Sequence, residues 1–168
     1  MKKLFLLLSI TVISLSAFIV VENQLPKSAW KKINKEIAKL WPDIEVEKEQ
    51  IKDDEYQLFK LNNGEKLQGY MFLSKAPSRY DHFDYMLIYT PELNIKSAQI
   101  LVYRESYGGE IGSVRWLKQF IGLNKQNTFE LGEDIQGISG ATVSCQAATK
   151  GFKKSTIIMN KLKDEGAI

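Results

Sequence analysis

Five short segments between residues 44 and 103 have the pattern of β-strands, and they constrain the fold more than any other feature of the chain. The first alternates apolar and charged residues, as a strand with one buried face does. The second and third flank Asn62-Asn63-Gly64, a sequence typical of a hairpin turn. The segments are residues 44–51, 56–61, 66–73, 83–89 and 95–103. Together they predict a largely antiparallel, twisted sheet.

Helices are expected on both sides of this region in the chain. Between Pro26 and Pro42, apolar residues recur at spacings of three and four, which gives a helix one apolar face with lysines opposite. That helix either covers the domain or lies on a membrane surface. A second long helix begins near Thr142, and a short one over residues 114–121 ends at Gly122. The predicted fold is therefore α+β, a single domain with an N-terminal and a C-terminal helix flanking the sheet.

Residues 4–21 form an apolar run with no charge and no helix-breaking residue. As a helix, this run would span about 27 Å, close to the thickness of the hydrocarbon core of a bilayer. It is either a cleaved signal peptide or an uncleaved membrane anchor, with a buried core helix as the alternative. The two main interpretations place the chain from residue 22 onward outside the cytoplasmic membrane, in the cell envelope. Under both interpretations the chain has three parts: the signal peptide or anchor over residues 1–21, an N-terminal helix over 22–43 and a domain over 44–168.

Composition excludes several classes of function. The formal net charge is +3, of which Lys2 and Lys3 supply two, and the remaining +1 argues against nucleic acid as a partner. The chain has one cysteine, Cys145, and one histidine, His82. Such a chain has no internal disulfide and no cysteine-ligated cluster, and neither a metal nor a thiol is expected to carry its chemistry. Cys145 lies on the apolar face of the last helix and is expected to be a buried structural thiol.

The common catalytic motifs are incomplete. Residues 137–141 nearly match the nucleophile elbow of hydrolases, but Ala141 replaces the last glycine and His82 precedes the serine instead of following it. No dinucleotide-binding fingerprint occurs, and the glycine spacing of a phosphate-binding loop at residues 132–139 lacks its lysine. What remains is a run of small residues, 137–144, that leads into a helix. The N–H groups and dipole of that helix favour an anion near Thr142; the alternative is an ordinary serine cap on a tight turn.

The same run resembles a known modification motif. Residues 139–142 are Ser-Gly-Ala-Thr, followed by Val143 and Ser144. This sequence looks like the flavinylation motif of FMN-binding domains, which include the C subunit of the sodium-pumping NADH:quinone reductase and the G subunit of the Rnf complex. In that family the threonine carries FMN through a phosphoester bond that a separate flavin transferase installs. The resemblance therefore implies that Thr142 is the acceptor.

The resemblance extends over roughly residues 66–160. Residues 103–109 (Tyr-Arg-Glu-Ser-Tyr-Gly-Gly) look like the glutamate- and glycine-containing loop of the family, with Ser106-Tyr107 in place of Thr-Pro. Trp116 and Gln119-Phe120 fall where the family has its Trp and Gln-Phe. Gln136 departs from the family, which has Asp three residues before the motif's serine; Asp134 lies two residues earlier.

The resemblance also implies roles for individual residues. Glu105 would accept a hydrogen bond from the flavin or from its loop. Tyr107 would either stack on the flavin ring or pack on the core. His82 has no assigned role, although residues 80–82 could lie beside the ribityl chain. The implied cofactor-binding residues are Thr142, Ser139, Gly140, Ala141, Ser144, Glu105, Tyr107, Gly108 and Gly109.

The sequence therefore predicts a membrane-associated electron carrier outside the cytoplasmic membrane, with covalent FMN as its cofactor. The implied partners are the flavin transferase, a donor and an acceptor of electrons that are proteins or quinones, and the membrane itself through residues 4–21. Two alternatives stay open: a flavin-dependent reductase with its own small-molecule substrate, and a flavin-free binding module tethered to the membrane.

Overall fold

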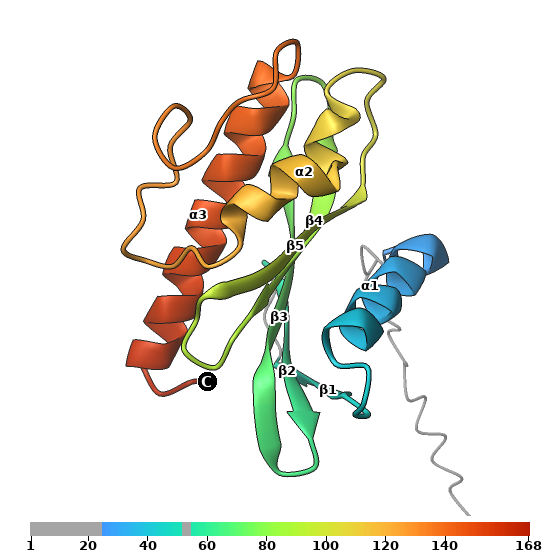
Figure 1. Ribbon diagram of the computed structural model, residues 1–168, viewed down its shortest axis with the longest axis vertical. Helices are drawn as coiled ribbons and strands as arrows, with labels where there is room; N and C mark the ends of the chain where they lie inside the picture. The colour runs from blue at the N-terminus through green and yellow to red at the C-terminus, as the bar shows by residue number, and fades with distance from the viewer. Residues whose placement is uncertain (1–24, 52–54) are drawn as a thin grey trace, which may run out of the picture.

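A five-stranded antiparallel sheet runs through the centre of the computed structural model, which describes residues 25–51 and 55–168 (Figure 1). Each strand pairs with its neighbour in the sequence, so the order across the sheet is β1-β2-β3-β4-β5. The strands are β1 (Glu47–Ile51), β2 (Gln57–Asn63), β3 (Lys66–Pro77), β4 (His82–Tyr89) and β5 (Ile95–Val102). The predicted α+β class and the antiparallel pairing are confirmed.

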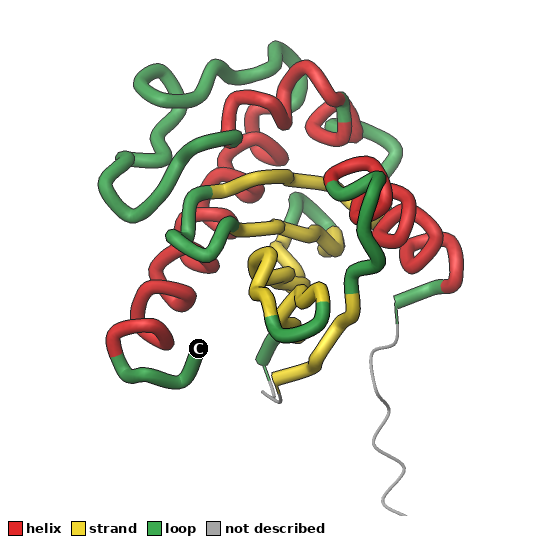
Figure 2. Tube along the Cα trace, turned by 60° about the horizontal axis from the view of Figure 1, so that its bottom comes forward, coloured by secondary structure: helices red, strands yellow, loops and turns green. Residues whose placement is uncertain are grey.

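The two long helices lie on opposite faces of the sheet. α1 (Lys27–Leu40) covers one face with Ala29, Ile33 and Ile37, while α3 (Thr142–Asp164) covers the other (Figures 1 and 2). Two separate apolar cores result, one on each side of the sheet. β4 is buried along nearly its whole length because both of its faces are covered, which explains why its residues are almost all apolar, with Asp84 as the exception.

The first strand is shorter than its sequence pattern predicts. The alternation begins at Ile44, but β1 begins at Glu47. Glu47 pairs with Asn62, and the hairpin turn to β3 begins directly beyond Asn63. Beyond Asn62, β2 has only Asn63, so residues 44 and 45 have no β2 residue opposite them.

Short helical turns and a long loop connect β5 to α3. They are η1 (Gly109–Gly112), α2 (Val114–Leu117) and η2 (Lys118–Phe120), so the single short helix predicted over residues 114–121 is an α-turn followed by a 3-10 turn. Phe120 is buried and contacts the ring of Phe152 on α3 edge-on, at 4.7 Å between centroids. This contact fixes the connection against the helix that follows it.

The predicted signal or anchor, residues 4–21, lies outside the described residues. Within residues 25–51 and 55–168, none of the helices is long and apolar enough to cross a membrane.

Candidate functional site

The loop that follows β5 is attached to the turn between β3 and β4 by Glu105. One carboxylate oxygen of Glu105 accepts hydrogen bonds from the backbone N–H of Tyr80, at 2.7 Å, and of Asp81, at 3.0 Å. The bond from Tyr80 is the main reason why the pKa of Glu105 lies below its usual value. Of the two roles that the sequence left open for this residue, the structure provides a loop contact: Glu105 holds two segments together.

This arrangement makes the stability of the protein depend on pH. Because the pKa of Glu105 is lowered in the folded protein, its ionised carboxylate stabilises the fold at pH values above 4.5, the usual pKa of this group. This contribution is lost as the pH falls through the lowered pKa of the folded protein. Glu105→Gln should therefore lose less stability than the wild type on acidification. Thermal unfolding followed from about pH 7 to about pH 3 measures this difference. Parallel curves for the two proteins would show that the carboxylate does not contribute in this way.

A second contact joins the same loop to the first turn of α3. The hydroxyl of Tyr103 donates to the carbonyl oxygen of Tyr107 at 2.6 Å and lies 2.8 Å from the hydroxyl oxygen of Ser144. Gly108 lies directly against both hydroxyls: a Cβ there would come within 2.2 Å of the Ser144 oxygen and 2.7 Å of the Tyr103 oxygen. The backbone of Gly108 also has a φ of 84°, which favours glycine. The glycine loop and the start of α3 thus form one unit although they are far apart in the sequence.

The Ser-Gly-Ala-Thr segment is a turn that leads into α3. Gly140, with a φ of 83°, reverses the chain, and the N–H of Ala141 bonds to the carbonyl of Ile138 at 3.0 Å. α3 then begins at Thr142, and its N-cap residue, Ala141, makes no side-chain cap. The serine cap considered from the sequence is therefore not formed. The first N–H groups of this 23-residue helix therefore receive no side-chain cap from their N-cap residue, and the exposed Thr142 lies beside them.

The hydroxyl groups of this segment differ in accessibility. Ser139 and Thr142 are exposed, whereas Ser144 is only 4% exposed and bonded to Tyr103. An enzyme that modifies the segment can therefore reach Ser139 and Thr142 without opening the glycine loop.

Trp116 and Gln119 hold the chain three residues before Ser139. The indole N–H of Trp116 donates to the carbonyl oxygen of Gln136 at 2.8 Å, and the N–H of Gln136 donates to the side-chain oxygen of Gln119 at 2.7 Å. Both contacts reach the backbone of Gln136, while its side chain is exposed. Any residue except proline can make them at position 136, so glutamine in place of the family's aspartate does not disturb this part of the site.

Gln119→Ala should release this segment locally. The N–H of Gln136 would lose its acceptor, so its hydrogen exchange should become faster, and the free energy of unfolding should fall by about 1 kcal/mol. Hydrogen exchange read by NMR and urea unfolding measure the two effects. Gln126→Ala is the matched control, because Gln126 is exposed and bonds through its backbone N–H. Unchanged exchange at Gln136 in the Gln119 variant would contradict this role.

The carboxylate of Asp134 forms hydrogen bonds within the long loop that precedes α3. Its carboxylate accepts bonds from the hydroxyl of Thr128 and from the N–H of Phe129, both at 2.7 Å, and the bond from Thr128 is the main cause of its lowered pKa. Phe129 is buried and has a positive φ of 53°, which these bonds stabilise. Asp134 thus shapes the long loop and does not replace the missing aspartate at position 136.

The sequence did not reveal the ion pair between the buried Asp84 and the partly exposed Arg104. Asp84 is 2% exposed and is paired with Arg104, which also donates to the carbonyl oxygen of His82 at 3.2 Å. His82 in turn bonds to Asp81 through its Nδ1 and through its backbone N–H, each at 2.7 Å. The only available signal was Asp84 itself, a lone charge within the apolar run of β4.

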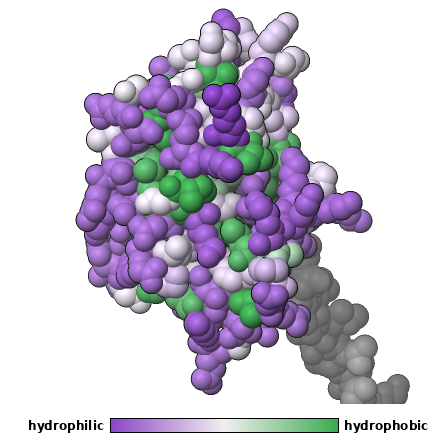
Figure 3. Space-filling view, viewed as in Figure 1, coloured by the Kyte–Doolittle hydropathy of each residue, from purple (hydrophilic) through white to green (hydrophobic). Residues whose placement is uncertain are grey.

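Exposed apolar groups surround this end of the molecule. Tyr80 is 83% exposed, Tyr107 86% and Val143 49%. They belong to the three segments that Glu105 and Tyr103 hold together, and Tyr107 is therefore not a core residue. Elsewhere the face of the molecule seen in Figure 3 is mostly hydrophilic, with hydrophobic side chains in small separate areas. The ring of Tyr107 is open to a ligand, while the guanidinium of Arg79 lies over the Tyr80 ring, 5.1 Å from its centroid.

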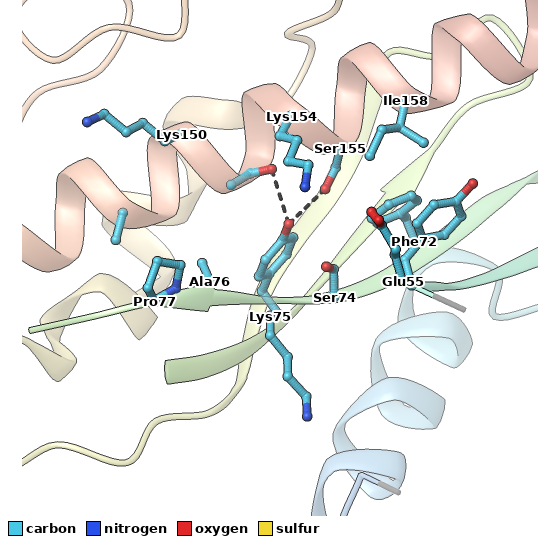
Figure 4. Close-up of a pocket in the computed structure, with 14 residues that line it drawn as sticks. Glu55, Phe72, Ser74, Lys75, Ala76, Pro77, Lys150, Lys154, Ser155 and Ile158 are labelled. Atoms are coloured by element: carbon cyan, nitrogen blue, oxygen red, sulfur yellow. Dashed lines mark hydrogen bonds between the residues drawn. The ribbon is translucent and has the colours of Figure 1, made fainter. Parts of the chain in front are cut away.

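A separate cleft of about 250 Å³ lies between α3 and β3, and none of the predicted site residues lines it (Figure 4). The hydroxyl of Tyr85 in it is bonded to the carbonyl oxygen of Gly151 at 3.1 Å and to Ser155 at 2.8 Å. Burial raises the pKa of Tyr85, so this phenol is a neutral packing group. The side chains of Lys75 and Lys150 point away from the cavity, whereas that of Lys154 points toward it, and Glu55 also lines it.

Cys145 is completely buried, as its place on the apolar face predicted, and burial raises the pKa of its thiol. Among residues 25–51 and 55–168, no group of three or more His, Cys, Asp and Glu side chains could hold a metal ion.

The fold and the site together define a class of protein. In this class, an antiparallel sheet carries a glutamate- and glycine-containing loop that packs on the small-residue turn at the start of a long helix. Residues 81–156, a little under half of the chain, match the family model described as an FMN-binding domain. This match confirms the resemblance to the FMN-binding domain family that the motifs of this part of the chain showed. The comparison with curated proteins gave no match. The residues present also suit FMN: N–H groups without a side-chain cap for its phosphate, an exposed hydroxyl beside them, and exposed aromatic rings nearby.

Proposed function

We propose that this protein is an electron-transfer flavoprotein of the cell envelope whose FMN is esterified through its phosphate to Thr142. The observation that carries the proposal is the position of Thr142, an exposed hydroxyl on the first residue of a long helix that lacks a side-chain cap. A phosphodiester at this position keeps one negative charge, which the helix dipole and the first N–H groups favour. The family match over residues 81–156 supports the choice of cofactor.

The bound flavin would supply the electron chemistry, and the chain would supply its position and its surroundings. Thr142 would hold the phosphate end at the start of α3. The exposed rings of Tyr80 and Tyr107 offer apolar surface to the flavin ring. Glu105 and Tyr103 keep these parts together by the hydrogen bonds described above.

In this proposal the domain works outside the cytoplasmic membrane, attached to it through residues 4–21. A covalent bond suits that location, where a loosely bound flavin would be lost by diffusion. The partners are a flavin transferase that installs the cofactor and redox proteins or quinones that give and take electrons.

A reductase with its own substrate is the second candidate, and the observation that favours it is the Asp81–His82 pair at this end of the sheet. An imidazole paired with a carboxylate can move a proton to or from a substrate. His82→Ala would then abolish turnover with small electron acceptors while leaving the flavin attached. A carrier without a proton-transfer step would lose little activity.

The proposal is tested by isolating the protein from its native envelope and measuring its intact mass together with its visible absorbance after denaturation. The expected result is a mass increase of one FMN less one water and a flavin spectrum that stays with the denatured chain. A protein without flavin would favour the membrane-tethered binding module. Recovery of the unprocessed chain from the cytoplasm in soluble form would contradict the location.

A further inference from the structure

Four lysines form a single row along the outer side of α1. Lys27, Lys31, Lys35 and Lys39 follow one another at a spacing of four, which places them on one face of the helix, and all four are exposed. The residues that α1 buries against the sheet, such as Ile33, lie on the opposite face. The row therefore points away from the domain. We refer to these four residues as the lysine row.

Within residues 25–51 and 55–168, the lysine row meets an acidic partner only at its end, where Lys39 pairs with Glu36. No acidic residue stands three or four positions from Lys27, Lys31 or Lys35 in the sequence. Glu36 lies 3.6 Å from Lys39, but its carboxylate also accepts a hydrogen bond from Ser97 at 2.8 Å. Like charges at a spacing of four destabilise a helix. An anionic surface in front of the row would relieve this repulsion.

One lysine of α1, Lys32, does not belong to the lysine row. Lys32 turns toward the sheet, where its ammonium group donates to the carbonyl oxygen of Leu101 at 2.9 Å. That charge is used within the fold, in contrast to the outward charges of the lysine row.

The chain brings one end of the lysine row close to the apolar run. Residues 22–26 are all that separates residue 21, the last of that run, from Lys27. A linker of five residues spans at most roughly 18 Å when fully extended. If residues 4–21 enter a membrane, the start of α1 is held near the lipid headgroups, and a helix of 14 residues laid along them would bring all four lysines into contact.

We propose that the lysine row binds the anionic lipid headgroups of the membrane that residues 4–21 enter. This inference rests on the membrane attachment in the proposed function and not on the flavin. It also orients the domain. Because α3 lies on the opposite face of the sheet from α1 (Figure 1), Thr142 is turned away from the membrane. A flavin on Thr142 would then face redox partners in the aqueous envelope rather than quinones within the bilayer.

The test uses the full chain reconstituted in vesicles of phosphatidylcholine alone, or of phosphatidylcholine with about one quarter phosphatidylglycerol. A membrane-impermeant acetylating reagent is added, and the modification of each lysine is followed by mass spectrometry. In the anionic vesicles, Lys31 and Lys35 should react about fivefold more slowly than in the neutral ones. Lys150 and Lys154, on α3, should react at the same rate in both. Salt at about 0.5 M should remove the protection, because it screens charges.

A matched pair of variants completes the test. Lys31→Gln with Lys35→Gln removes the middle of the lysine row, and the protection of Lys27 and Lys39 should then be lost. Lys150→Gln with Lys154→Gln removes two charges at the same spacing on α3 and should leave that protection intact. Equal labelling of the lysine row in both kinds of vesicle, or protection only in native membranes that contain other proteins, would overturn the inference. A chain that fails to float with either kind of vesicle would instead refute the membrane attachment.

Discussion

Replacing Thr142 with alanine is expected to abolish covalent flavin on this protein when it is produced together with a flavin transferase. The variant lacks the only hydroxyl that is both at the acceptor position of the family motif and exposed at the first residue of α3. Intact mass should show the full increase of one FMN less one water in the wild type and none in the variant. Covalent flavin on Thr142→Ala would show that the proposed attachment is wrong.

Two serine variants serve as controls for this result. Ser144→Ala should keep the flavin, because this hydroxyl is buried against Tyr103 and is not needed as an acceptor. Ser139→Ala changes an exposed residue of the turn and should at most lower the yield of modification. The fold should survive in Thr142→Ala, with a change of no more than about 0.5 kcal/mol in the free energy of unfolding, because Thr142 is exposed and is not the N-cap residue. Loss of flavin in that variant would thus not be a consequence of unfolding.

A wild type without flavin would direct attention to Gln136. Its backbone is held by Trp116 and Gln119 whatever its side chain, and the side chain itself is exposed. Gln136→Asp should therefore fold normally and should restore modification if the transferase reads an aspartate at this position.

Gly108→Ala should cause the second large effect, a combined loss of stability and of flavin attachment. The added Cβ would come within 2.2 Å of the hydroxyl oxygen of Ser144, at a backbone φ that alanine rarely adopts. Strain of this kind costs about 2 kcal/mol or more. The loop would also move away from α3, and the position of Tyr107 relative to Thr142 would change. Urea unfolding measures the first effect, and intact mass after production with the transferase measures the second.

Another glycine in the same connection provides the control. Gly112→Ala should have little effect, because its Cβ would meet only the Cβ of Ile100 at an ordinary distance of 3.8 Å. Combining Gly108→Ala with Ser144→Ala should recover part of the stability, since it removes the closest clashing atom and leaves the backbone strain. A Gly108→Ala protein as stable and as fully modified as the wild type would contradict the close packing of the loop on α3.

The local structure of this protein was largely predictable from its sequence. The spacing of apolar residues predicted α1, and Asn62-Asn63-Gly64 predicted the hairpin between β2 and β3, because both patterns arise from neighbours in the chain. The start of α3 at Thr142 was also predicted from the turn residues before it. The division of the chain at residue 44, the envelope location and the roles of the individual flavin-site residues stay predictions.

The contacts that assemble the site were not predictable in the same way. Glu105 bonds to residues more than twenty positions away, and Asp84 meets Arg104 across the end of the sheet. The family resemblance identified Trp116 by its position in the sequence. It did not predict the hydrogen bond from Trp116 to the carbonyl oxygen of Gln136. Such pairs depend on where separate turns meet in space, which no local pattern specifies.

The sequence by itself thus determined most of the secondary structure, the class of fold and the family motif, since these depend largely on residues close together in the chain. Only the tertiary structure decided which hydroxyls in and beside that motif are open. Ser144 and Thr142 are two residues apart and chemically alike, yet the return of the glycine loop buries Ser144 against Tyr103 and leaves Thr142 exposed at the start of α3. The physical reason is packing between segments distant in sequence, which covers one face of the first helical turn and leaves the other face to solvent.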